Sequence, residues 1–123
     1  MTTPPDIYKR VLDFASRVLK MERALARDPR VNRNALRQLA NSASSIGANL
    51  EEAKAGQSRA DFHAKLRISL KEARESLYWL RLLHQTDSIN PGRIQPLITE
   101  ANEIVAILTV IARKTNPRNP AIS

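Results

Sequence analysis

Four stretches of the chain carry apolar residues at an alternating three- and four-residue spacing. They run over residues 7–25, 36–53, 62–80 and 94–111. This spacing places one apolar stripe along one side of an α-helix. Because four such stripes on short connections bury one another well as a bundle, we predict an all-α fold, an antiparallel up-down four-helix bundle. A chain of 123 residues fits one domain of this kind, over residues 1–123.

Residues that begin or end helices separate the four stretches. Asp28-Pro29 ends the first helix, because proline disfavours the helical conformation in the residue before it. We expect Gly56 to end the second helix in the left-handed conformation, Ser58 to cap the third, and Asn90-Pro91 to open the fourth. The predicted helices span residues about 5–27, 33–55, 59–85 and 91–114, followed by a loose tail over 115–123.

The middle of the second helix has an unusual composition. Residues 40–49 are almost all Ala, Ser, Gly or Asn. These small side chains have mediocre helix propensity. They indicate that a neighbouring helix approaches closely, or that the segment is stable only once it is packed.

The first and last helices carry more apolar surface than a single bundle needs. The first has a second apolar stripe, turned about 120° from the main one, and residues 104–112 of the last are apolar on nearly all sides. A surface helix normally keeps one polar face, so we expect a second chain to cover these sides. The predicted oligomer interface contains Leu12, Leu19, Val105, Ile107 and Val110.

The net charge of +8 is concentrated near the beginning of the chain. Residues 1–37 contain nine Lys or Arg and four Asp or Glu. A one-sided basic surface attracts polyanions, nucleic acid above all. Aromatic residues are scarce, so phosphate contact fits this surface better than base recognition. The predicted nucleic-acid contacts are Arg10, Arg17, Lys20, Arg23, Arg27, Arg30, Arg33 and Arg37.

The residue types needed for catalysis are scarce in recognisable arrangements. The chain has no cysteine, its three glycines are scattered, and neither His63 nor His84 has a carboxylate three positions before it. We therefore expect no enzymatic activity, no metal and no cofactor. The start of the chain lacks an apolar signal segment and the longest apolar run is short, so we expect a cytoplasmic protein that does not enter a membrane.

Polar residues beside the apolar stripes have two interpretations. In the structural one, Asn49 makes a buried hydrogen bond, and Glu52, Glu72 and Glu75 form helical pairs with nearby cations. Those cations are Arg67, Lys71 and Arg74. In the functional one, Asn49 and Glu52 form a small polar site in a cleft. The structural interpretation is favoured.

Three sequence segments resemble a known family. They are residues 45–53 (SIGANLEEA), 58–62 (SRADF) and 66–76 (LRISLKEARES). Together they are similar to the core signature of the bacterial four-helix-bundle family that includes proteins encoded in intervening sequences of 23S ribosomal RNA genes. That family is similar to the accessory protein of diversity-generating retroelements. The signature covers residues 44–80, and its positions here are Asn49, Glu52, Phe62, Glu72 and Glu75.

The resemblance implies an assembly and a class of partner. It implies that the bundles of the family form a ring-like homopentamer. In the retroelement branch of the family, a basic pentamer associates with a reverse transcriptase and with nucleic acid. The chain departs from the family at Glu52-Ala53, where many members have Glu-Gly. We expect a non-enzymatic oligomeric bundle that binds RNA or DNA electrostatically, as an accessory scaffold to a nucleic-acid enzyme. The alternative is a protein–protein interaction module with an acidic partner and no direct nucleic-acid role.

Overall fold

The computed structural model describes residues 6–86 and 89–118. Within these residues it contains four α-helices and no β-strand, which confirms the all-α prediction. The helices are α1 (Asp6–Leu25), α2 (Arg33–Lys54), α3 (Arg59–Gln85) and α4 (Pro91–Thr115).

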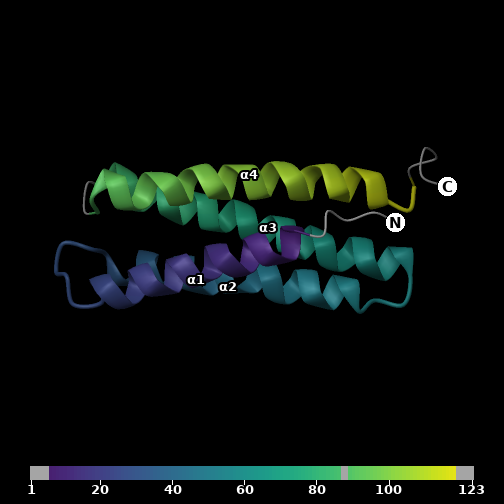
Figure 1. Cartoon of the computed structure of the whole chain (residues 1–123), viewed down its shortest axis with the longest axis horizontal. Coiled ribbons are helices and arrows are strands. Elements are labelled where there is room, and N and C mark those ends of the chain that lie inside the picture. Colours follow the sequence, from purple (N-terminus) through teal and green to yellow (C-terminus); the bar gives the residue numbers. More distant parts are fainter. Residues whose placement is uncertain (1–5, 87–88, 119–123) are drawn as a thin grey trace.

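Each helix packs against two others. The pairs in contact are α1 with α2, α2 with α3, α3 with α4, and α4 with α1, whereas the diagonal pairs do not meet in the described part of the chain. Figure 1 shows that α1 ends, α2 begins, α3 ends and α4 begins at one end of the molecule. The α2–α3 connection lies at the other end. The four helices therefore surround one shared core.

The four apolar stripes supply that core. Each helix buries the side chains that recur at three- and four-residue spacing, because those positions share one side of the helix. The largest of the fully buried side chains include Phe14 of α1, Leu39 of α2, Leu66 of α3 and Leu108 of α4. The hydrophobic pattern thus predicted correctly which face of each helix points inward.

Capping residues fix where three of the helices begin. The side chains of Asn32 and Ser58 each accept a hydrogen bond from the backbone amide three residues later, at 2.9 and 3.0 Å. Asn90 accepts one from the amide two residues later, at 2.8 Å, and Pro91 follows it at the start of α4.

The end of α2 differs from the sequence-based expectation. Gly56 does not adopt the left-handed conformation, and the capping residue Ala55 is right-handed helical. Instead, the space around Gly56 is restricted. A Cβ atom added there would lie 3.1 Å from the Ala53 carbonyl oxygen and 3.2 Å from the Asp61 Cβ. Gly56 is thus needed for close approach of the chain, and the left-handed prediction was wrong.

Two other helix ends also differ. α1 stops at Leu25 instead of residue 27, and the Asp28 amide donates to the Leu25 carbonyl at 3.0 Å in the turn that follows. Thr115 is the last residue of α4 and is buried, so the tail does not loosen there. Arg59 of α3 donates to the carbonyls of Thr115 and Asn116 at 3.4 and 3.3 Å. The predicted helix start at residue 5 and the tail over 119–123 lie outside the described residues.

The apolar side chains of α4 lie partly in the core of the bundle and partly on its surface. By length and composition alone, α4 could cross a membrane, with a mean hydropathy of 1.4 over 18 residues. A core helix of a bundle passes the same test, and α4 buries eight residues from Ile94 to Thr115 against its neighbours.

Candidate nucleic-acid interface

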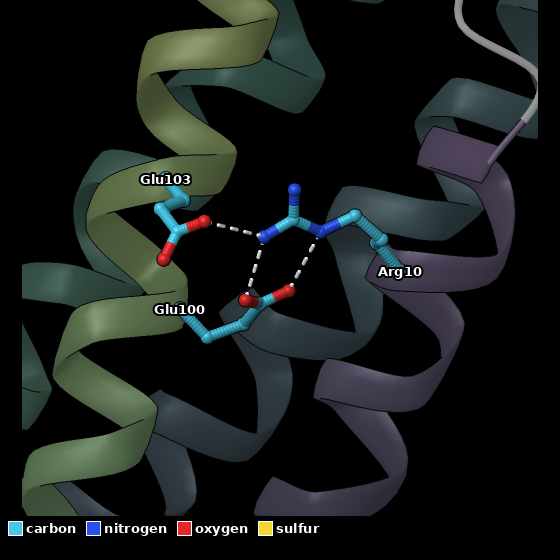
Figure 2. A network of polar contacts seen from close by, with 3 residues as sticks. All are labelled: Arg10, Glu100 and Glu103. Atoms are coloured by element: carbon cyan, nitrogen blue, oxygen red, sulfur yellow. Dashed lines mark hydrogen bonds and ion pairs between the residues drawn. The ribbon is translucent and has the colours of Figure 1, made fainter.

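Arg10 is occupied within the protein. Its guanidinium crosses from α1 to α4 and donates to both carboxylate oxygens of Glu100, at 3.0 and 2.7 Å, and to Glu103 at 3.1 Å (Figure 2). The hydrogen bonds to Glu100 and then Glu103 raise the pKa of Arg10 above its ordinary value. The charge of Arg10 is therefore neutralised by α4, so we leave Arg10 out of the candidate interface.

Three further cations near the start of the chain have partners. Lys9 forms an ion pair with Asp13 at 2.6 Å on the exposed side of α1. Arg30 donates to Asp28 through its side chain and its backbone amide, and these hydrogen bonds lower the pKa of Asp28 to about 2. Arg33 donates to the Ala26 carbonyl at 3.0 Å and so stays closely attached to the loop after α1.

The remaining predicted cations keep their charge available. Within the described part of the chain, they are exposed and make no hydrogen bond or ion pair. Four of them follow one another along the second half of α1 and the loop after it, and one lies near the start of α2. They are Arg17, Lys20, Arg23, Arg27 and Arg37.

The fold adds one cation that the sequence analysis missed. Arg93, in the first turn of α4, lines a hollow of about 190 Å³ together with Arg17, Met21 and Leu97. Arg17 and Arg93 are far apart in the sequence, so no local pattern connects them. Only the packing of α4 against α1 brings these two residues to one hollow. We call Arg17, Lys20, Arg23, Arg27 and Arg93 the basic end surface.

The predicted oligomer-interface residues divide into two groups. Leu12 is 69% exposed, Leu19 is 42% exposed and Val110 is 46% exposed. Val105 and Ile107 are half-buried and pack against the core of their own bundle. The exposed leucines lie on α1 and Val110 lies on α4.

A groove between α1 and α2 has the exposed Leu12 in its lining. It encloses about 370 Å³, and its lining is mostly apolar or small: Tyr8, Leu12, Ala15, Gly47 and Ala48 are among the residues. The small side chains of α2 make this groove, because larger ones would fill the space beside α1.

The signature residues Asn49 and Glu52 make only structural contacts. Asn49 donates from Nδ2 to the Ser45 carbonyl at 2.9 Å, within α2 itself. Glu52 is exposed and forms an ion pair with Lys65 of α3 at 2.9 Å. Neither side chain lines a described hollow.

Glu72 and Glu75 lie together on α3. Partial burial raises the pKa of Glu72, and the nearby charge of Glu75 raises it further. Glu75 accepts a hydrogen bond from the Trp79 indole at 3.1 Å. Neither glutamate forms an ion pair with the cations of α3 in the described residues, so the expected helical pairs are not formed. No three His, Asp or Glu side chains of the described residues could hold a metal ion together.

Comparisons with known proteins agree with the fold. Residues 5–110 match the family described as 23S rRNA-intervening sequence protein. The chain is also similar to a crystal structure of a protein of unknown function from the S23 ribosomal protein family of Bacteroides thetaiotaomicron, with a TM-score of 0.82 and 35% identity over 90% of this chain and 98% of that one. No curated protein sequence matches the chain. Since the family match covers most of its length, the chain belongs to the 23S rRNA-intervening sequence protein family.

Proposed function

We propose that this protein is a non-enzymatic, cytoplasmic, oligomeric bundle that binds RNA or DNA electrostatically. The observation that carries the proposal is the basic end surface. There, Arg17 and Arg93 line one hollow at the α1–α4 contact, and Lys20, Arg23 and Arg27 follow along α1 and the loop after it. All five are exposed and have no partner in the described residues. A field of this kind concentrates polyanions. Because Lys and Arg contact phosphates without reading bases, binding should depend on salt and discriminate poorly between sequences.

Assembly into a ring would strengthen this field. Two of the exposed apolar residues lie on separate surfaces, Leu12 beside the α1–α2 groove and Val110 on the outer side of α4. Two different surfaces favour head-to-tail contacts, which close into rings, over the self-complementary contact of a two-fold dimer. We propose a ring-like homopentamer of up-down bundles, as the family resemblance implies. This assembly would act as a scaffold for a nucleic-acid enzyme such as a reverse transcriptase.

Charge reversal tests the basic end surface. We expect Lys20→Glu, Arg23→Glu and Arg27→Glu together to weaken binding to mixed-sequence RNA and DNA and to reduce its salt dependence. The matched control is Lys54→Glu, Lys114→Glu and Arg118→Glu. This triple variant changes the net charge equally but at the opposite end of the bundle. Equal loss in both triple variants would show that overall charge, not this surface, causes binding.

Sedimentation tests the assembly, and nuclease treatment tests the class of partner. Leu12→Asp should convert the oligomer to single chains, and a wild-type protein that sediments as a single chain would contradict the ring. An acidic protein partner that is captured equally well after nuclease treatment, without any direct RNA or DNA binding, would favour the protein–protein alternative.

A further inference from the structure

The outer face of α3 carries a second row of cations. Arg67, Lys71 and Arg74 lie within about 60° of one another around the helix, and Tyr78 lies in the same sector one turn further on. The three cations are exposed and make no hydrogen bond or ion pair in the described residues. We call these four residues the α3 row.

The α3 row and the basic end surface lie on different helices. The basic end surface belongs to α1, the loop after it and α4, whereas α1 and α3 are diagonal in the bundle and have no helix–helix contact in the described residues. The two exposed apolar surfaces proposed for assembly belong to α1, α2 and α4. The α3 row therefore stays accessible in the assembly proposed above.

The three cations surround an open hollow. It measures about 590 Å³ on the surface of α3, and its other lining residues are the apolar Ala64, Ile68 and Leu70. Ile68 is 41% exposed, so part of this apolar lining is in contact with solvent. A surface lined by both apolar and cationic side chains suits a ligand that combines flat, weakly polar groups with negative charge. The bases and phosphates of a nucleic acid are such groups.

Tyr78 supplies an exposed aromatic ring one helical turn beyond Arg74. Its side chain is 57% exposed. Such exposure is unusual for an aromatic side chain, and this chain has only five aromatic residues (Phe, Trp and Tyr). Its ring lies edge-on to Trp79, with 5.0 Å between ring centroids and 75° between planes. The Trp79 indole in turn donates to Glu75. Tyr78 thus combines a ring contact with Trp79 and a largely exposed side chain.

We infer that the α3 row is a second nucleic-acid contact, for single-stranded RNA or DNA. Arg67, Lys71 and Arg74 hold phosphates, and Tyr78 stacks on a base. Stacking of this kind requires unpaired bases, because bases within a duplex already stack on one another. The inference rests on the proposed function, and it adds strand selectivity that the basic end surface alone does not give. One bundle then contacts nucleic acid through two separate surfaces.

Binding of labelled oligonucleotides tests this inference. The probes are a uridine oligonucleotide of about 20 nucleotides and an RNA duplex of the same length. We expect Tyr78→Ala to weaken binding of the single strand about tenfold and to leave duplex binding unchanged, whereas Tyr78→Phe retains single-strand binding. Arg67→Gln, Lys71→Gln and Arg74→Gln together should weaken single-strand binding and reduce its salt dependence. The matched control is Lys54→Gln, Lys114→Gln and Arg118→Gln.

Crosslinking provides a readout on the unmodified protein. Irradiation of the wild-type chain with an oligonucleotide that contains 5-iodouracil should attach the base to Tyr78, and mass spectrometry separates this site from Tyr8. Crosslinks that avoid Tyr78, or equal loss of single-strand and duplex binding in Tyr78→Ala, would overturn the inference. If the α3 variants bind normally while Lys20→Glu, Arg23→Glu and Arg27→Glu abolish binding, the α3 row is wrong and the proposed function stands. If instead the α3 variants lose binding while Lys20→Glu, Arg23→Glu and Arg27→Glu bind normally, the α3 row is supported and the basic end surface is wrong.

Discussion

The hydroxyl groups of Ser42 and Ser76 lie 2.8 Å apart, buried between α2 and α3. A third buried hydroxyl, that of Ser69, donates to the Ile46 carbonyl of α2 at 2.8 Å. A serine side chain is short, so it reaches the backbone of the next helix only where the two helices approach closely. The small residues in the middle of α2 therefore create a close contact with α3.

Substitutions at Ser76 should measure how little space this contact leaves. We expect Ser76→Ala to lower the free energy of unfolding by about 1 kcal/mol, because a buried hydrogen bond is lost. Ser76→Leu should cost more, about 1–3 kcal/mol, because the larger side chain cannot fit without moving α2. Urea denaturation at a fixed protein concentration measures both values. A leucine variant as stable as the alanine variant would contradict the close approach.

The features of this fold that the sequence could predict are those set by residues close together in the chain. The apolar stripes and the caps at Ser58 and Asn90 depend on residues a few positions apart, so they were correctly anticipated. The partner of Arg10 could not be anticipated from the sequence, because Glu100 lies 90 positions away. Only the packing of α4 on α1 brings Glu100 near Arg10. The same holds for Arg93 in the basic end surface. The spacing of residues along the chain therefore predicts the helices more accurately than the arrangement of charges on them.

The two glycines of the α2 region should respond oppositely to alanine. Gly47 lies within the helix, and an added Cβ would meet Val11 at 3.4 Å, an ordinary contact distance. Gly47→Ala should therefore stabilise the fold by about 0.5–1 kcal/mol, because glycine costs backbone entropy in a helix. Gly56→Ala should destabilise it, because the Cβ would crowd two backbone atoms and Asp61. Thermal unfolding measures both, and a stabilised Gly56→Ala variant would contradict the crowding.

His63 should make stability depend on pH. Partial burial lowers the pKa of His63, and the charges of Arg67 and Arg59 lower it further. The unfolded chain then takes up the proton first, at a pKa of about 6.5. Stability should therefore be full above pH about 6.5 and decline as pH falls from there through the lower native pKa. The measurement is the difference in urea midpoint between wild type and His63→Gln across this range.

The titration of His63 itself provides the control for that prediction. NMR of the native protein should show a midpoint below the ordinary value. Arg67→Gln should move that midpoint upward, because one of the two charges that oppose protonation is gone. A native midpoint at or above 6.5, the ordinary value, would contradict the linkage.

The bridge from Arg10 to Glu100 should contribute to stability and not to nucleic-acid binding. Both side chains are largely shielded from solvent, at 28% and 19% exposure, so a double-mutant cycle with Arg10→Met and Glu100→Gln should give a coupling of about 1 kcal/mol. The same cycle on the exposed Lys9–Asp13 pair should give a smaller coupling, because water screens it. Since Arg10 is already neutralised by α4, Arg10→Met should lower RNA affinity less than Arg23→Met does. Equal losses of RNA affinity in these two variants would return Arg10 to the nucleic-acid interface.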